Sequence, residues 1–242
     1  RDRRDIISSF SGKVVLLKGP DWKQWVIVHM LPTSRPGRPG RGCIHSTLLD
    51  VDGDGDLDFC GSHQGVCWLE CPDKPFSAEW KRREVDSEIQ GTHCLITGDV
   101  DRDGKLDLIA NSGRGPGQPS VPFSLPWQKI PPKPLEAKSW IRNVFAVRDA
   151  PGASHYTGFG DVDGDGLDDL YVGQEGGLPH LLYLHQSDGT AKDISADARA
   201  NWLESSRGAL ILDFDNDGDQ DIYSVNDFGH HVVPNVLWRN DG

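Results

Sequence analysis

The chain has 242 residues, of which 36% are hydrophobic and 26% charged, and this balance is typical of a folded globular protein and excludes a disordered chain. A formal net charge of −12 disfavours a nucleic-acid partner, because an acidic surface repels phosphate groups. No apolar run approaches the ~20 residues of a membrane-spanning helix. The 28 glycines and 16 prolines favour short strands and turns over long helices.

Three strand-like segments open the chain: DIISSF from Asp5, KVVLLKG from Lys13 and WVIVHML from Trp25. They fit the second, third and fourth strands of a four-stranded unit that recurs later in the sequence. Asp5 stands where the last aspartate of a recurring acidic segment would lie. We therefore expect residues 1–33 to form a partial repeat.

Four acidic segments then follow a single pattern, D-x-D-x-D-G-x-x-D. They start at Asp50, Asp99, Asp161 and Asp213, so their starts are 49, 62 and 52 residues apart. A short apolar stretch precedes each segment, and a run rich in β-branched or aromatic residues follows it, which predicts strands on both sides. Each acidic segment is therefore expected to be the turn between two antiparallel strands.

A second hairpin completes each unit. GVCWLE from Gly65 and WKRREV from Trp80 flank a proline-containing turn, and SLPWQK from Ser124 and WIRNVFAV from Trp140 repeat that arrangement. Four strands in about 50 residues make one blade of a β-propeller. The sequence thus predicts an all-β fold: a β-propeller of four-stranded antiparallel blades, with calcium-binding turns between strands 1 and 2.

About five blade equivalents are expected in a single domain or fragment, 1–242. The predicted blades are approximately 1–33 (partial), 43–86, 92–149, 154–205 and 207–242 (partial). Two arrangements stay open: the N-terminal strands complete the last blade and close a five-bladed ring, or the chain is a piece of a larger propeller.

The acidic turns have the chemistry of calcium sites. Calcium takes six to eight hard oxygen ligands, and aspartates at positions 1, 3, 5 and 9 supply carboxylates while the residue at position 7 supplies a backbone carbonyl. Glycine at position 6 lets the backbone reverse. About four Ca²⁺ ions are expected, and they would change the formal charge from −12 to −4. The predicted ligands are Asp50, Asp52, Asp54, Asp56 and Asp58; Asp99, Asp101, Asp103, Lys105 and Asp107; Asp161, Asp163, Asp165, Leu167 and Asp169; and Asp213, Asp215, Asp217, Asp219 and Asp221.

An EF-hand shares positions 1, 3, 5 and 6 but needs glutamate at position 12. Position 12 holds Gly61, Ala110, Val172 or Ser224 here, and none of these is a bidentate ligand. The flanking segments are strand-like rather than helical. Magnesium would prefer fewer protein ligands and more water. We therefore interpret the acidic segments as calcium-binding turns between strands. The alternative is that they are acidic turns without a metal.

The segment GFGDVDGDGLDDLYVG, from Gly158, resembles the FG-GAP/VCBS repeat family, which includes the calcium-binding blades of integrin α-chain propellers. Residues 65–111 are similar to the propeller of aldos-2-ulose dehydratase-type proteins, and residues 206–242 to propellers of the cartilage-acidic-protein/UnbV type. The resemblance implies a propeller fold that hosts adhesion, lectin or lyase functions and usually closes with about seven blades.

A ligand site is expected at the channel mouth of such a propeller, on the face opposite the calcium turns. Three of the first strands are preceded by glycine and a nearby histidine, which are His45, His93 and His155, and Arg207 stands near the equivalent place in the fourth. Converging imidazoles could hold a metal or a sugar acid, or act as a general base. The alternative is that they are repeat-encoded packing residues. Polar loop residues complete the predicted ligand-binding set, above all His63, Asn226 and Asp227.

The strong motifs are structural, so the leading hypothesis is an extracellular or surface module for protein or glycan interaction, as in cell adhesion, rather than an enzyme. A secreted, periplasmic or cell-surface location follows from sites suited to extracellular calcium. A carbohydrate lyase or dehydratase that uses the three histidines is the first alternative, and a structural part of a larger assembly is the second. Among five cysteines, Cys60 and Cys67 either meet across a hairpin or are small buried residues.

Overall fold

The short apolar segments of the sequence form strands in a computed structural model of the protein, which describes residues 5–29, 42–63, 65–77, 79–89, 92–110, 124–147, 154–174, 178–227 and 234–242. The described residues form β-strands and no α-helix, so the expected all-β class is confirmed. Within these ranges there is accordingly no helix long and apolar enough to cross a membrane.

The first sheet has three antiparallel strands in the order β1-β2-β3. They are β1 (Ile6–Phe10), β2 (Lys13–Lys18) and β3 (Lys23–His29). Asp5 precedes β1, and its Oδ1 accepts a hydrogen bond from the Gly19 amide just beyond β2, at 3.0 Å. The last aspartate of a complete acidic turn makes the same kind of bond, as described below. Asp5 therefore stands to β1 and β2 as the last aspartate of a complete turn stands to its second and third strands.

Three four-stranded antiparallel sheets follow, and in each the strands pair in chain order. The second sheet contains β4 (Ser46–Leu49), β5 (Asp58–Ser62), β6 (Val66–Glu70) and β7 (Lys81–Asp86). The third contains β8 (Leu95–Gly98), β9 (Asp107–Ala110), β10 (Ser124–Lys129) and β11 (Ile141–Val147). The fourth contains β12 (Ser154–Gly160), β13 (Asp169–Gln174), β15 (Leu181–His185) and β16 (Ala191–Asp193).

The last sheet has three strands, β18 (Ser206–Leu212), β19 (Asp221–Asn226) and β20 (Val236–Trp238). A separate two-stranded ribbon joins β14 (Leu178–Pro179) to β17 (Leu203–Glu204). The described strands β1–β3 pair with one another and not with β18–β20. The arrangement in which the N-terminal strands complete the last blade is therefore wrong.

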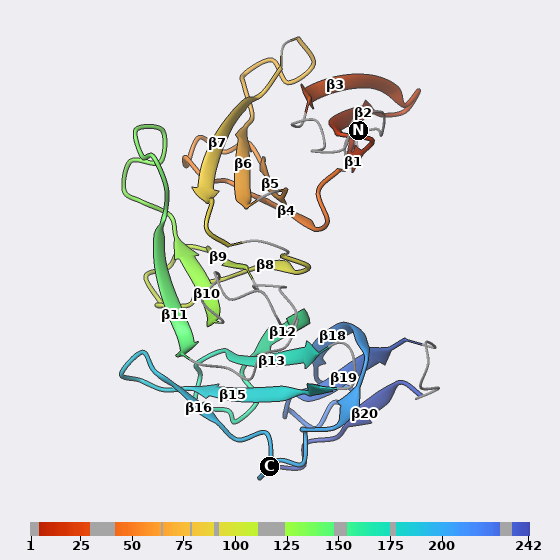
Figure 1. The fold of residues 1–242 in the computed structure, drawn as a ribbon, viewed down its shortest axis with the longest axis vertical. Helices are drawn as coiled ribbons and strands as arrows, with labels where there is room; N and C mark the ends of the chain where they lie inside the picture. The colour runs from red at the N-terminus through yellow and green to blue at the C-terminus, as the bar shows by residue number, and fades with distance from the viewer. Residues whose placement is uncertain are drawn as a thin grey trace.

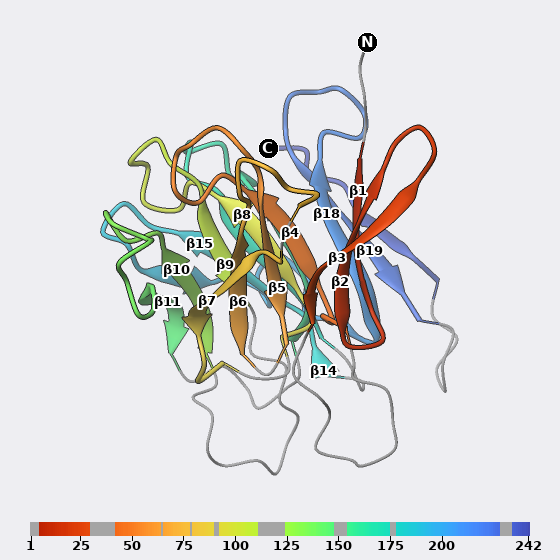
Figure 2. The same ribbon diagram turned by 90° about the horizontal axis from the view of Figure 1, so that it is seen from above.

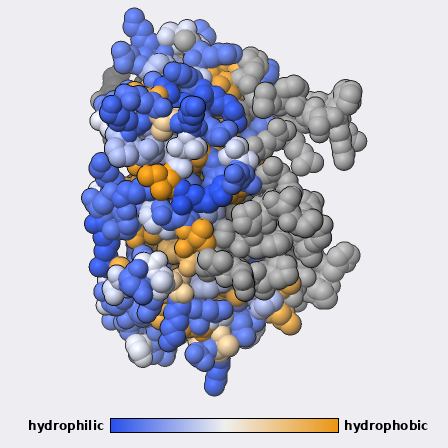
Figure 3. Space-filling model, turned by 60° about the vertical axis from the view of Figure 1, so that its left-hand side comes forward, coloured by the Kyte–Doolittle hydropathy of each residue, from blue (hydrophilic) through white to orange (hydrophobic). Residues whose placement is uncertain are grey.

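The five main sheets follow one another along an arc, from β1–β3 to β18–β20 (Figure 1). The first strands β4, β8, β12 and β18 lie toward the concave side, and β7, β11 and β16 lie on the outside. Figure 2 shows the turns that follow these first strands gathered along one edge of the array. The outer side is mostly hydrophilic, with small hydrophobic patches between the sheets (Figure 3).

Four hydrophobic clusters lie between the five sheets, one at each junction. Val14 and Phe59 belong to the first cluster, Trp68 and Leu108 to the second, Ile109 and Leu170 to the third, and Tyr171 and Ile222 to the fourth. Because neighbouring strand residues point to opposite faces, Ile109 and Leu108 serve different junctions, as do Leu170 and Tyr171. Each sheet is thus buried on both faces where it has two neighbours.

Repeated hydrogen bonds also link successive sheets. The amide of Trp80 donates to the Ile27 carbonyl at 2.6 Å, and the amide of Trp140 donates to the Val85 carbonyl at 3.0 Å. Each tryptophan directly precedes the last strand of its own sheet. Its amide reaches the last strand of the preceding sheet, which is β3 for Trp80 and β7 for Trp140. The tryptophan spacing that marks the second hairpin in the sequence is therefore part of the sheet-to-sheet packing.

The hairpin register settles the cysteine alternatives. Cys60 lies opposite Trp68, while Cys67 lies opposite Gly61, so the two thiols point to opposite faces of the sheet. Cys60 packs in the cluster between the second and third sheets, and Cys67 in the cluster between the first and second. All five cysteines are free thiols, and these two are small buried core residues.

Gly98, at the end of β8, marks a close approach between the third and fourth sheets. A Cβ atom built there would lie 2.2 Å from Cε1 of Phe159. We expect Gly98→Ala to lower the free energy of unfolding by about 1–3 kcal/mol, the usual cost of overpacking. The measurement is the midpoint of urea denaturation. Gly208→Ala is the matched control, because its new Cβ would be no nearer than 3.4 Å to Val225; equal midpoints for the two variants would contradict the prediction.

Candidate metal centres

The four acidic turns share one internal hydrogen-bond pattern. The carboxylate at position 1 accepts the amide of the glycine at position 6: Gly55 to Asp50 at 3.1 Å, Gly104 to Asp99 at 2.9 Å, Gly166 to Asp161 at 2.9 Å, and Gly218 to Asp213 at 3.3 Å. These four glycines have φ values between 83° and 102°, which lie in the left-handed region. The glycine at position 6 thus folds the turn back over its first aspartate.

The aspartate at position 9 begins the second strand and is almost fully buried: Asp58, Asp107, Asp169 and Asp221 are each 0–2% exposed. In Asp169, Oδ2 accepts the Val162 amide and Oδ1 accepts the His185 amide, both at 2.8 Å. Asp58 and Asp221 make the same pair of bonds. One carboxylate therefore joins the turn, the second strand and the end of the third strand.

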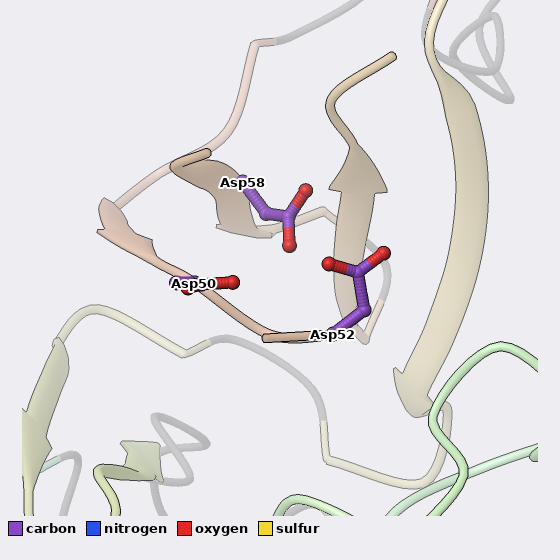
Figure 4. Close-up of side chains that lie close together, drawn as sticks. All are labelled: Asp50, Asp52 and Asp58. Atoms are coloured by element: carbon purple, nitrogen blue, oxygen red, sulfur yellow. The ribbon is translucent and has the colours of Figure 1, made fainter. Parts of the chain in front are cut away.

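The carboxylates at positions 1, 3 and 9 converge in every turn. In each set, one oxygen per residue lies within 4.8 Å of the others. Figure 4 shows Asp50, Asp52 and Asp58 pointing toward one another from the end of β4, the turn and the start of β5. The sets are Asp50, Asp52 and Asp58; Asp99, Asp101 and Asp107; Asp161, Asp163 and Asp169; and Asp213, Asp215 and Asp221.

The aspartate at position 5 does not belong to these sets. Its Oδ1 accepts the amide at position 7, as Asp54 does from Asp56 at 2.8 Å and Asp165 does from Leu167 at 2.7 Å. Such a bond leaves the second carboxylate oxygen available. The role of the backbone carbonyls at position 7 as ligands stays a prediction.

A hard divalent cation fits this donor set. All donors are carboxylate oxygens, which calcium prefers. Asp52, Asp99 and Asp161 each have an Oδ1 that is buried and without a hydrogen-bond partner among the described residues. A buried polar atom without a partner is costly unless something else binds it. A positive charge beside these oxygens would offset that cost.

Burial also perturbs the protonation of these carboxyls. Desolvation is the largest cause that raises the pKa of Asp58 to about 6, of Asp107 to about 7 and of Asp169 to about 6. Neighbouring carboxylates of the same turn add to the effect, such as Asp101 beside Asp107. Negative charge is thus unfavourable in these positions unless a positive charge is bound beside it.

One further position belongs to these sites and carries no mark in the aspartate motif. At or near the end of each third strand, the residue whose register places it opposite the aspartate at position 9 is Glu70, Lys129, Leu184 or Arg239. The equivalence follows from the register, in which the preceding residues Leu69, Gln128, Tyr183 and Trp238 face the residue after that aspartate. These residues lie on or next to the predicted third strands. Their distance along the sequence from the aspartate motif differs between repeats, so the motif alone does not identify them.

The predicted channel-mouth residues, unlike those of the aspartate turns, do not share one pattern of contacts. Nδ1 of His45 accepts a hydrogen bond from the Leu95 amide at 3.1 Å, and its ring lies edge-on to Tyr156 with centroids 6.3 Å apart. It therefore joins the second sheet to the third. The side chain of His155 lies outside the described part of the structure, and the metal-capable clusters found among described side chains include neither His45 nor His93.

The remaining predicted residues also have partners within the fold. The Arg207 guanidinium pairs with Asp227, with Nη2 to Oδ2 at 2.6 Å, and both side chains are well exposed. Asn226 is buried, and its Nδ2 donates to the Pro234 carbonyl at 2.9 Å. His63 is buried near the Gly42 carbonyl, at 3.4 Å from Nδ1. Of this group, Arg207 and Asp227 present charge to solvent.

His45 makes a testable contribution to pH dependence. Burial lowers its pKa from 6.5, and a proton on Nδ1 would oppose the Leu95 amide. The unfolded chain therefore binds a proton near pH 6.5 that the folded chain still excludes, so stability falls as pH drops below about 6.5. We expect His45→Gln to lose less stability than the wild type between pH 7.5 and pH 5.5. Urea denaturation in saturating calcium measures the difference, with the exposed Lys133→Gln as control; equal losses would disprove the assignment.

Taken together, these features define an all-β repeat protein in which the sheets that start with β4, β8, β12 and β18 each carry an aspartate turn between their first two strands. Residues 161–224 match a family model described as an FG-GAP-like repeat. This match confirms the FG-GAP resemblance seen in the sequence: residues 161–224 carry a repeat of the FG-GAP type. No curated protein matches the chain.

Two solved structures align with most of the chain. The crystal structure of the V. cholerae biofilm matrix protein Bap1 aligns with 92% of this chain and 31% of its own, at 15% identity and a TM-score of 0.50. A quinonprotein alcohol dehydrogenase-like protein from Bacteroides thetaiotaomicron aligns with 92% of this chain and 49% of its own, at 11% identity and a TM-score of 0.46. The chain thus spans about a third to a half of these proteins.

Proposed function

We propose that the chain is a calcium-stabilised interaction module of an extracellular or cell-surface protein. The observation that carries the proposal is the convergence of three carboxylates in each of four equivalent turns. Extracellular calcium modules bind with Kd values of roughly 10⁻⁴–10⁻³ M, which suits exposed turns of this kind. The FG-GAP-like repeat and the fold shared with a biofilm matrix protein support the same setting.

In this proposal calcium serves the scaffold and the loops serve the partner. The aspartate at position 9 links three segments of each repeat, so a cation bound beside it holds the first hairpin and the third strand together. The opposite edge of the array is then free to present loops to a protein or a glycan, with Arg207 and Asp227 as its described exposed charges. Other parts of a longer parent chain are also possible partners.

A carbohydrate lyase or dehydratase is not proposed. That alternative needs the imidazoles of His45, His93 and His155 to be directed at a substrate. The Nδ1 atom of His45 is instead engaged with the Leu95 amide of the neighbouring sheet. This bond favours the packing role for the one histidine of the three whose contacts are established.

Isothermal titration of the purified, chelator-treated chain with CaCl₂ tests the first half of the proposal. Saturable binding in the micromolar to millimolar range is expected, and a titration without binding heat or any change in melting temperature would reject it. Glycan arrays and pull-downs from extracellular fractions, with calcium or with EDTA, test the second half. Calcium-dependent retention of a partner is expected, and turnover of a sugar substrate without retention would favour an enzyme.

A further inference from the structure

The four aspartate turns face four chemically different side chains at the end of the third strand. The residue there is acidic in the first turn (Glu70), basic in the second (Lys129), apolar in the third (Leu184) and basic in the fourth (Arg239). The next backbone amide donates to the buried aspartate in the first, third and fourth turns, from Cys71, His185 and Asn240. The backbone frame is therefore shared, and the turns differ in this side chain.

In the second turn the side chain enters the carboxylate cluster. Nζ of Lys129 is hydrogen-bonded to Oδ2 of Asp101, and it lies 2.8 Å from Oδ2 of Asp103. Asp101 is one of the three converging carboxylates of this turn. The side chains of lysine and both aspartates are only about one-third exposed. The ammonium thus pairs with two carboxylates of this turn, one of which belongs to the converging set.

Among the described contacts of the other three turns, no lysine or arginine side chain is hydrogen-bonded to a carboxylate of the turn. Oε2 of Glu70 accepts from Nε of Arg83 at 2.7 Å. Leu184 carries no charge. Arg239 pairs with Asp241 at 2.8 Å and comes only to 3.8 Å from Oδ2 of Asp215, with its side chain 59% exposed.

We propose that Lys129 is the built-in counter-ion of the second turn, so that this turn binds no divalent cation while the other turns do. The proposal rests on the function proposed above for the other turns. A calcium ion at the second turn would have to displace a cationic group from Asp101 and then remain close to it, and like charges at a few ångströms repel. Lys129 itself supplies one positive charge to the cluster there and holds the third strand to the turn.

Calcium stoichiometry tests the proposal in the whole chain. The chain has four aspartate turns, and we expect the wild type to bind one calcium ion fewer than this number. Lys129→Gln is expected to bind one calcium ion more than the wild type. Lys133→Gln is the matched control, because Lys133 pairs with the exposed Glu136, away from the turn. Isothermal titration gives the number of sites, and far-UV circular dichroism shows that each variant is folded.

A second comparison keeps a positive charge at position 129. Lys129→Arg is expected to keep the wild-type stoichiometry, whereas Asp161→Asn, in the third turn, is expected to remove one ion. A gain of one ion in Lys129→Arg, or no gain in Lys129→Gln, would overturn the role of Lys129 while leaving calcium binding intact. A wild type that binds no calcium would instead reject the proposed function and this inference together.

Discussion

Removal of calcium is expected to lower the melting temperature of the chain by on the order of 20 °C. A ligand at a hundredfold excess over its Kd stabilises the folded state by about 2.7 kcal/mol per site. A domain of this size melts about 2–4 °C lower for each kcal/mol lost. Three or four aspartate turns acting on one folded array therefore account for a shift of this order.

The measurement is differential scanning fluorimetry of the dialysed chain in increasing CaCl₂. The midpoint should rise with the logarithm of calcium concentration above the Kd, because the metal binds the folded state. Magnesium at equal concentration is the control, since its octahedral preference and firmly held water suit these turns less well. A midpoint that is identical in EDTA and in 10 mM calcium would show that the carboxylate clusters are stable without metal.

Asp169→Ala is expected to destabilise the chain by roughly 2–6 kcal/mol even in EDTA. The substitution leaves the part-buried amide of Val162 and the buried amide of His185 without their acceptor, and each unsatisfied buried group costs about 1–3 kcal/mol. The effect is therefore independent of calcium. It separates the structural role of this aspartate from its role as a ligand.

Asp163→Ala is the matched comparison within the same turn. Asp163 contributes to the carboxylate set, but its described hydrogen bond goes to the exposed amide of Asp165 at 3.2 Å. We expect this variant to unfold at nearly the wild-type urea concentration in EDTA and to lose the calcium-dependent part of its stability. If both variants were equally destabilised in EDTA, the buried bonds of Asp169 would not be the reason.

The strands and the aspartate turns could be predicted because their signals are local. The glycine at position 6 and the aspartates at positions 1, 3 and 9 act within nine residues, and the structure gathers them as expected. Asp5 followed from the same pattern, as the last aspartate of a turn. Its bond to the Gly19 amide supports the assignment of the N-terminal strands as second, third and fourth.

The third-strand residues could not be found in this way, because they meet the turn across a loop of variable length. Glu70 and Lys129 follow the aspartate at position 9 by 12 and 22 residues, and Leu184 and Arg239 by 15 and 18. A fixed-spacing search therefore passes over them. Only the strand register places them at one position in space.

The role of His45 could not be decided from its recurrence. A histidine that repeats before successive first strands fits a ligand site and a sheet-to-sheet bond equally well, since both are repeated in such an array. The bond from the Leu95 amide identifies the second use for His45. Likewise, hairpin spacing allowed Cys60 and Cys67 to pair, whereas the observed register turns them to opposite faces.

Each hydrophobic cluster is shared by two consecutive sheets, so cohesion passes from neighbour to neighbour along the chain. The second, third and fourth sheets are held from both sides, while β1–β3 and β18–β20 have one described neighbour each. Amide hydrogens of β5, β9 and β13 should then exchange with deuterium most slowly, and those of the two outermost sheets first. Opening would thus begin at the extremities of the arc and move inward one sheet at a time.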